Sequence, residues 1–131
     1  MKIEIPGFGA LRVDNLVLDF NGTLAVDGRL LPGVRPRLRA LARRLELHVV
    51  TADTFGSVRR AMSKAPCRVV VLGPARQDAA MLRAARLGIA LVQREGAAAA
   101  ALRAADVAAP SIADALDLFL HPLRLKATLR S

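Results

Sequence analysis

Polar side chains that follow short apolar runs are the residues of this chain best suited to chemistry. Asp19, Thr51 and Asp78 each follow a run rich in Val and Leu, directly or after a short connection, and Arg76 stands two positions before Asp78. Such runs are typical of buried parallel strands, whose carboxyl ends meet at one edge of a sheet. Two carboxylates, a hydroxyl and a guanidinium are therefore expected to converge on one small site.

The carboxylates of this expected site suit a reaction at phosphorus. A carboxylate can attack a phosphoryl group, which splits hydrolysis into formation and breakdown of an acyl phosphate. The attacking anion and the phosphate repel each other, so Mg²⁺ is needed to bridge them, held by about two carboxylates with waters completing its octahedron. We expect Asp19 to be the nucleophile, with Asp78 and the amide carbonyl of Asn21 helping it to hold Mg²⁺.

The same strand ends offer groups that bind phosphate. Gly22 has no side chain, so backbone N–H groups around it can approach a phosphate closely. Thr51 adds a hydroxyl and Arg76 adds a guanidinium, so we assign these three residues to phosphate binding. A structural reading stays open, in which Asp19 caps a turn, Asp78 caps a helix and Gly22 serves backbone geometry.

Strand patterns and helix patterns alternate along the chain and must position these residues. Short Val- and Leu-rich runs bounded by Gly, Pro or Asn predict strands, whereas Leu38, Leu41 and Leu45 fall on one face of a predicted helix. This alternation predicts an α/β fold with a Rossmann-like parallel sheet and helices on both of its faces. The expected strands cover positions 16–20, 47–51, 68–72, 87–92 and 106–108, and further helices cover 54–64, 77–86, 96–105 and a segment that Ser111 caps.

Two β-hairpins are expected beside this alternation. Positions 2–5 and 11–13 alternate polar and apolar residues around a Pro- and Gly-rich turn, which predicts an N-terminal hairpin. Asp27 and Gly28 form the Asp-Gly pair that a tight two-residue turn favours, which predicts a second hairpin. No linker, repeat or low-complexity tail divides the sequence, so residues 1–131 are expected to form a single domain.

Charge and cysteine content narrow the class of protein. The formal charge is +9, from 20 Lys and Arg against 11 Asp and Glu. A basic total attracts anions, but the clustered basic and aromatic residues of a nucleic-acid interface are missing, so nucleic acid is disfavoured as a partner. Cys67 is the only cysteine in the sequence, which excludes an intrachain disulfide. With no signal segment and no apolar stretch of ~18 residues, we expect a cytoplasmic protein without a membrane partner.

The ordered set of segments resembles the haloacid dehalogenase superfamily. Leu16–Thr23 (LVLDFNGT) is similar to its first motif, a hydrophobic strand ending in Asp-x-x-Gly-Thr, and Val49–Thr51 is similar to its second. Gln77–Ala90 resembles the stretch after the fourth motif in P-type ATPases and their soluble relatives, and the two ends of the chain, 3–9 and 121–130, resemble those relatives as well. The likeness therefore spans nearly the whole chain.

The resemblance implies a haloacid dehalogenase-type (HAD-type) domain without a cap, since the interval between Asp19 and Thr51 is too short to hold one. It implies a Mg²⁺-dependent phosphatase that works through a phosphoaspartate on Asp19, with a phosphorylated substrate. A site without a cap is open, and a second copy of the chain could help to close it, so a homo-oligomer is one expected form.

Two departures from the superfamily pattern support a second reading. Asn21 stands where superfamily phosphatases usually carry an aspartate as general acid and base, and an amide cannot donate and retrieve a proton. The 26 positions 52–77 between Thr51 and Asp78 are too few for the usual interval, and the lysine expected there could be replaced by Lys64 or, better placed, Arg76. The sequence thus favours a slow phosphatase, with a catalytically degenerate HAD-fold protein of binding or assembly role as the alternative.

Overall fold

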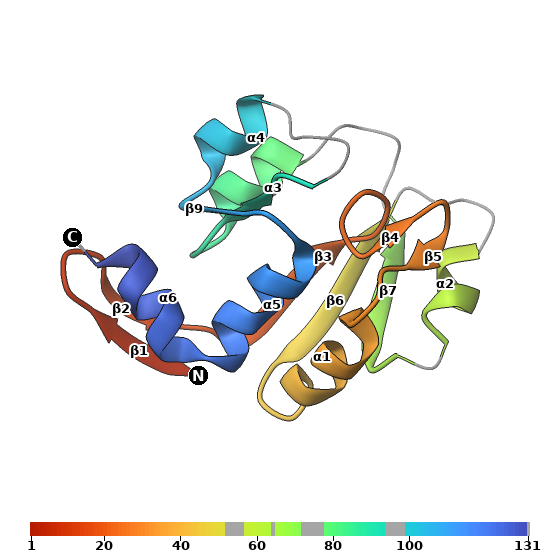
Figure 1. Cartoon of the computed structure of the whole chain (residues 1–131), viewed down its shortest axis with the longest axis horizontal. Helices are drawn as coiled ribbons and strands as arrows, with labels where there is room; N and C mark the ends of the chain where they lie inside the picture. The colour runs from red at the N-terminus through yellow and green to blue at the C-terminus, as the bar shows by residue number, and fades with distance from the viewer. Residues whose placement is uncertain (52–56, 64, 72–77, 94–98, 131) are drawn as a thin grey trace. The chain divides into compact units, whose positions relative to one another are not determined.

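The computed structural model describes residues 1–51, 57–63, 65–71, 78–93 and 99–130, of which positions 57, 68–71 and 78–80 are described by their backbone only. The described residues form a mixture of α-helices and small β-sheets, which confirms the predicted α/β class (Figure 1). Two compact units make up the chain. The first holds Met1 and Val13–Ala75, and the second holds Lys2–Arg12 and Arg76–Ser131.

The first unit is built on three parallel strands. β3 (Asn15–Asp19), β6 (Glu46–Thr51) and β7 (Cys67–Val71) are the parallel strands that their Val- and Leu-rich runs predicted, and they pair in the order β3-β6-β7. Each crossover between them carries a helix, α1 (Val34–Leu41) and α2 (Ser57–Ala61). The parallel order places the carboxyl ends of all three strands at one edge of the sheet.

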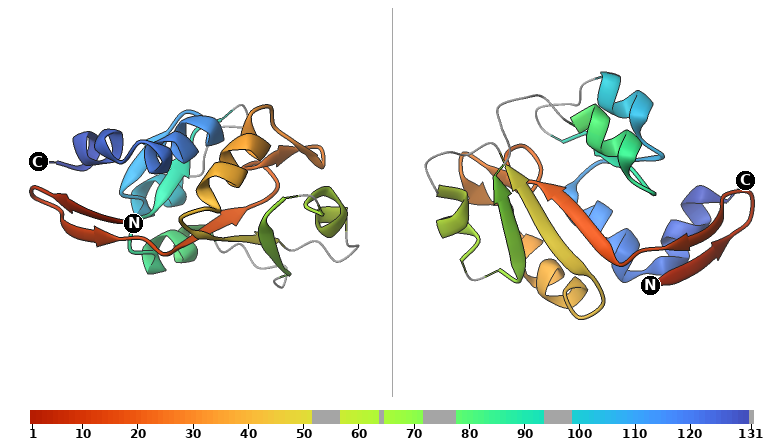
Figure 2. Two further views of the ribbon diagram at one scale, coloured as in Figure 1. Left: turned by 90° about the horizontal axis from the view of Figure 1, so that it is seen from below. Right: turned by 180° about the vertical axis from the view of Figure 1, so that it is seen from behind.

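Helix α1 covers one face of this sheet, as the views from below and from behind agree (Figure 2). Its buried stripe is Val34, Leu38 and Leu41, which fall at the spacing of one helical face. The predicted helix extended to Leu45, but α1 ends at Leu41 and a turn carries the chain to Leu45, which is buried without being helical. Leu45 is buried four residues after Leu41, which is the spacing of a helix, although the helix has already ended at Leu41.

A short hairpin follows β3. β4 (Ala25–Val26) and β5 (Arg29–Leu30) pair antiparallel around Asp27 (φ 51°) and Gly28 (φ 76°). Two consecutive positive φ angles are what a tight hairpin turn with right-handed strand twist requires, and the Asp-Gly pair tolerates them. The prediction of this hairpin is confirmed.

The second unit contains two separate pairs of strands. β1 (Lys2–Ile5) and β2 (Gly9–Arg12) form the predicted N-terminal hairpin, and β8 (Ile89–Leu91) pairs in parallel with β9 (Val107–Ala109). The predicted strand at 87–92 is shorter than expected, because Leu87 belongs to the preceding bend and Gly88 and Val92 lie outside the strand.

Four helices complete the second unit. α3 (Asp78–Ala84) packs against α4 (Ala99–Ala104), while α5 (Ile112–Leu120) packs on β8 and β9 and against α6 (Pro122–Leu129), which also contacts β1. The expected helices at 54–64, 77–86 and 96–105 are shorter where described, and their remaining positions lie partly outside the described residues. The core of this unit contains Ile5, Leu11, Ile112, Leu116, Phe119 and Leu125.

The described parallel strands thus belong to a three-stranded and a two-stranded sheet. One continuous Rossmann-like sheet with helices on both faces, the single domain over 1–131 and the absence of a cap stay predictions. Among the described residues, no helix combines the length and the apolar character needed to cross a membrane.

Candidate functional site

Asp19 occupies the position that the sequence predicted. It is the last residue of β3 and is half-buried, and its neighbours in the sequence, Leu18 and Phe20, are both buried. In the parallel register it lies opposite Val50 of β6. A carboxylate is thereby held where the parallel strands of the first unit end. In the described three-stranded sheet, its strand β3 is an outer strand.

A tight turn follows Asp19 and is held by one carbonyl oxygen. The Phe20 carbonyl accepts the N–H groups of Thr23, Leu24 and Ala25 at 3.2, 2.9 and 3.1 Å. Gly22 has a φ of 77°, the left-handed region in which glycine is favoured. The chain therefore turns sharply away from the strand end directly behind the carboxylate.

Backbone groups of this turn form hydrogen bonds with one another. The Gly22 N–H donates to the Ala25 carbonyl oxygen at 2.9 Å, so this N–H is already engaged. Gly22 serves backbone geometry, which is the structural reading left open above. A phosphate at this edge would have to be bound by side chains or by other N–H groups.

Asn21 and Thr51 lie at the same edge in different surroundings. Asn21, two positions after Asp19, is exposed, whereas Thr51 is buried with 5% of its surface exposed. Thr51 pairs with Val71 of β7 and follows Val50, the partner of Asp19. Because side chains alternate along a strand, Asp19 and Thr51 leave their strands on opposite faces and can meet only beyond the strand ends.

The remaining residues of the predicted site are only partly described. Asp78 begins α3 in the second unit, and its side chain lies outside the described residues, as do Lys64 and Arg76. The structure therefore places Asp19, Asn21, Gly22 and Thr51 at or just after the carboxyl ends of two neighbouring strands, with the side chains of Asp19 and Thr51 on opposite faces of the sheet. Within the part of the chain whose side chains are described, no group of three or more His, Cys, Asp and Glu residues could hold a metal ion.

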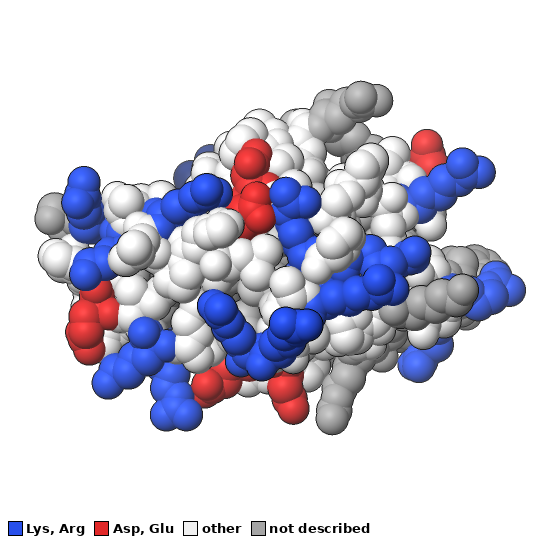
Figure 3. Space-filling model, turned by 60° about the horizontal axis from the view of Figure 1, so that its bottom comes forward, with Lys and Arg blue, Asp and Glu red and all other residues white. Residues whose placement is uncertain are grey.

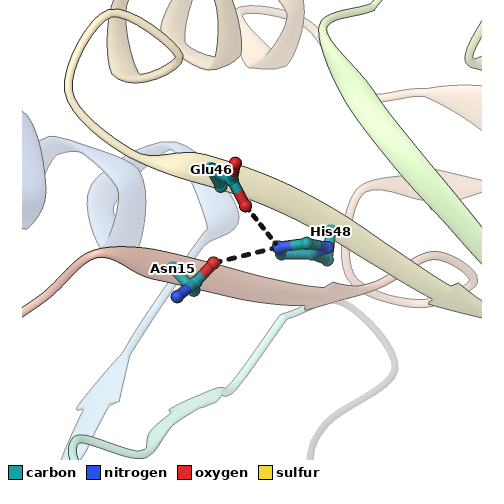
Figure 4. Close-up of polar contacts among 3 residues, drawn as sticks. All are labelled: Asn15, Glu46 and His48. Carbon is teal, nitrogen blue, oxygen red and sulfur yellow. Dashed lines mark hydrogen bonds and ion pairs between the residues drawn. The ribbon is translucent and has the colours of Figure 1, made fainter.

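A polar cluster that the sequence did not single out lies at the opposite end of these strands. His48 Nε2 is 3.1 Å from Asn15 Oδ1 and 3.7 Å from Glu46 Oε2 (Figure 4). The parallel register places Asn15 opposite Glu46, four residues before Asp19, a distance of ~13 Å along the strand. The cluster is a surface contact of the amino-terminal strand ends and is separate from the Asp19 edge.

Cys67, at the start of β7, offers no nucleophile. Burial raises the pKa of its thiol from the ordinary value of 9.0 to about 11. A thiol with so high a pKa stays protonated at neutral pH, and the protonated form is a weak nucleophile. A partly buried, protonated thiol behaves as a small hydrophobic side chain, so Cys67 is assigned to packing.

The surroundings of the first unit are basic. Arg35 and Arg39 of α1 and Arg43 and Arg44 of the following turn are exposed. On the face of the molecule shown in Figure 3, Lys and Arg side chains outnumber Asp and Glu and spread over much of the visible surface. Such a field raises the local concentration of anionic ligands without selecting among them.

Comparison with known proteins identifies two relatives, both from the archaeon Methanocaldococcus jannaschii. Uncharacterized protein MJ0072 is 46% identical over 39 residues, which is 30% of this chain and 89% of that protein. The chain belongs to the MJ0072 family.

A second protein of the same organism is also similar to this chain. Uncharacterized protein MJ0073 is 38% identical over 63 residues, 48% of this chain and 68% of that protein. No family model matches the chain. No solved structure matches it significantly. Because the names of both relatives state no activity, any function for the MJ0072 family has to be argued from the residues themselves.

Proposed function

We propose that this chain is a Mg²⁺-dependent phosphohydrolase of the HAD type, acting through an aspartyl phosphate on Asp19. The observation that carries the proposal is the half-buried Asp19 carboxylate at the end of parallel strand β3, with a turn at Gly22 directly behind it. The carboxyl edge of a parallel sheet is where ligands bind in α/β proteins. The proposal includes a Rossmann-like fold for the whole chain.

The proposed reaction has two steps at Asp19. A carboxylate oxygen of Asp19 forms a bond to phosphorus as the ester P–O bond breaks, and the leaving oxygen takes its proton from water. Water then attacks the acyl phosphate, which releases phosphate and restores the carboxylate. Asn21 cannot supply a proton in either step, so turnover is slow unless the leaving group is already a weak base.

The donor atoms at the site fit the proposed metal. Mg²⁺ prefers oxygen ligands, and the Asp19 carboxylate and the Asn21 amide supply oxygen from positions two residues apart. Asp78 is the proposed third ligand. When bound, Mg²⁺ would lower the repulsion between the carboxylate and the incoming phosphate.

Hydrolysis of p-nitrophenyl phosphate tests this proposal, because its leaving group needs no acid. We expect Mg²⁺-dependent release of p-nitrophenol by the native chain and loss of that release in Asp19→Asn and Asp78→Asn. Asp27→Asn is the matched control, since Asp27 lies in an exposed turn with φ 51° that Asn tolerates. Equal activity in the native chain and Asp19→Asn would refute the proposal.

A catalytically degenerate HAD-fold protein is the second candidate, and three observations favour it. Asn21 occupies the position of the usual acid, the Gly22 N–H is engaged by Ala25, and Thr51 leaves its strand on the face opposite to Asp19. A binding or assembly role would then remain. In that case purified native chain shows no turnover above the Asp19→Asn background, with or without Mg²⁺.

A further inference from the structure

A basic hollow is lined by residues of the second unit, as far as its lining is described. Its volume is about 550 Å³, inside the range of about 300–1,000 Å³ usual for small-molecule sites. Helices α3 and α4, which pack against each other, form its walls together with Phe8 from the turn between β1 and β2. In the described lining, Leu82 and three alanines form an apolar wall, and the charged residues are Arg83, Arg86, Arg103 and Asp106.

Arg86 is held in a fixed orientation at one side of this hollow. One of its guanidinium nitrogens donates to the Ala10 carbonyl oxygen at 3.2 Å, and its guanidinium carbon lies 5.4 Å from the centre of the Phe8 ring. A guanidinium carries five N–H donors, so this bond leaves others for a ligand. Its orientation is fixed before any ligand arrives, which reduces the entropy lost on binding.

Arg83 and Arg103 approach the hollow from the two facing helices. Both are exposed, and neither makes a hydrogen bond or an ion pair with any residue in the described part of the chain. Three cations around one hollow repel one another, and a bound anion removes that repulsion. Guanidinium groups bind phosphate through paired, charge-assisted hydrogen bonds.

Asp106 adds an acceptor to this basic wall. One of its carboxylate oxygens accepts the Gly88 N–H at 2.8 Å, which fixes the side chain, while the residue stays exposed. Among the described lining residues, three arginines and one aspartate carry a formal charge of +2, the complement of a phosphate monoester dianion. The carboxylate repels a free phosphate but accepts a hydrogen bond from a hydroxyl group.

We propose that this hollow binds a small phosphorylated polyol, such as a sugar phosphate. Arg83, Arg86 and Arg103 hold the phosphate, and Asp106 accepts a hydroxyl of the polyol. The hollow is a binding site in its own right. Its described lining includes none of Asp19, Asn21 and Thr51, and it does not depend on the phosphohydrolase proposal.

Isothermal titration calorimetry of the full chain with ribose 5-phosphate tests this inference. EDTA is included to suppress Mg²⁺-dependent turnover, and the Asp19→Asn chain is titrated in parallel. We expect the double variant R83Q/R103Q to lose at least tenfold in affinity, while R124Q/R130Q, which removes the same charge from α6 and its end, changes affinity less than threefold. Asp19→Asn is expected to bind as the native chain does.

Two further arms make the test specific. R83K/R103K keeps the charge but not the paired hydrogen bonds and should bind between the native chain and R83Q/R103Q, which guards against misfolding of the uncharged variant. Asp106→Asn keeps an oxygen that can accept the Gly88 N–H and removes the negative charge. It should tighten binding of inorganic phosphate and narrow the preference for ribose 5-phosphate over inorganic phosphate.

Three results would overturn the inference. The first is no measurable heat of binding to the native chain, and the second is equal loss of affinity in R83Q/R103Q and R124Q/R130Q, which would indicate attraction by net charge alone. The third is binding that disappears in Asp19→Asn, which would assign ribose 5-phosphate to the catalytic edge. Loss of p-nitrophenyl phosphate turnover alone would leave the hollow unaffected.

Discussion

At the residue scale, Asn21 decides how fast the proposed reaction at Asp19 is expected to be. The proposed mechanism lacks a proton donor because an amide occupies this exposed position two residues after the nucleophile. Replacing Asn21 by Asp should raise turnover of phenyl phosphate by ~10²–10⁴-fold, the usual contribution of general acid catalysis. The leaving group of this substrate, phenolate, is a stronger base than p-nitrophenolate and therefore needs a proton donor. Turnover of p-nitrophenyl phosphate should change little.

The ratio of kcat/KM for these two substrates checks this prediction. Asn21→Ser is the control, because it shortens the side chain without adding an acid. If Asn21→Asp and Asn21→Ser gave the same ratio, Asn21 would not occupy the proton-donor position.

Cys67 gives a second residue-scale prediction, on reactivity. Its thiol pKa of about 11 lies two units above the ordinary 9.0 because of burial. At pH 8 the folded chain should react with iodoacetamide about 100-fold more slowly than the unfolded chain, since alkylation follows the thiolate fraction. The measurement compares alkylation by mass spectrometry in buffer and in urea, and equal rates would contradict it.

The same pKa predicts how stability depends on pH. Folding favours the protonated thiol, so its contribution to the free energy of unfolding is complete below pH 9 and is lost as pH rises towards 11. Urea titrations at pH 8 and pH 10.5 should therefore show a larger fall in stability for the native chain than for Cys67→Ser. An equal fall in both chains would contradict this assignment.

The strand-end position of Asp19 could be predicted from the sequence, because an apolar run that stops at a carboxylate is typical of a buried strand reaching the sheet edge. The sequence also assigned Gly22 to phosphate contact, although the Gly22 N–H is taken by Ala25 inside the turn. Only the fold of the turn shows that bond. The sequence pattern shows that Asp19 and Thr51 both end strands, so they were predicted to share a site. The pattern does not show the register of the two strands, which decides on which face of the sheet each side chain lies.

At the element scale, the start of α5 offers a direct test of capping. Ser111 Oγ accepts the Asp114 N–H at 3.0 Å and donates to the Asp114 carboxylate at 2.8 Å. Ser111→Ala removes both bonds and should lower the free energy of unfolding by about 1 kcal/mol. Chemical denaturation measures this, with exposed Ser63→Ala as the control. Equal effects of both changes would show that the cap does not stabilise the helix.

Substitutions at two adjacent residues of the β4–β5 hairpin should change the stability of the chain in different directions. Gly28→Ala places a side chain on a residue with φ 76° and should destabilise the chain by about 1 kcal/mol. Asp27→Gly at φ 51° relieves the same conformation and should leave stability unchanged or raise it slightly. Midpoints of urea unfolding compare the two variants. Stabilisation by Gly28→Ala would contradict the described turn.

These elements were predictable to different degrees. Both hairpins and the cap at Ser111 carry local chemistry that specifies them, so they were predicted with nearly the observed bounds. Helix ends were predicted less well, because burial of Leu45 continues the helical period past the last helical residue, Leu41. A hydrophobic period reports burial, and a turn can bury a leucine as well as a helix can.

At the scale of the whole molecule, the sequence predicted the α/β class of the fold but not how its strands are divided among sheets. Alternating patterns specify which segments become strands, but they do not state which strands share a sheet. The described strands accordingly fall into a three-stranded parallel sheet in the first unit and a parallel pair in the second, where one sheet was expected. The basic charge, by contrast, follows from composition alone and predicts attraction of anions to both units.

A trapped phosphoaspartate is the most direct test of the proposed function. The native chain is mixed with p-nitrophenyl phosphate and Mg²⁺, quenched in acid, digested and analysed by mass spectrometry. The proposed mechanism predicts the mass of one phosphoryl group on the peptide that contains Asp19, absent without Mg²⁺ and absent in Asp19→Asn. An unmodified Asp19 peptide from a chain that releases p-nitrophenol, or a phosphoryl group on another residue, would contradict it.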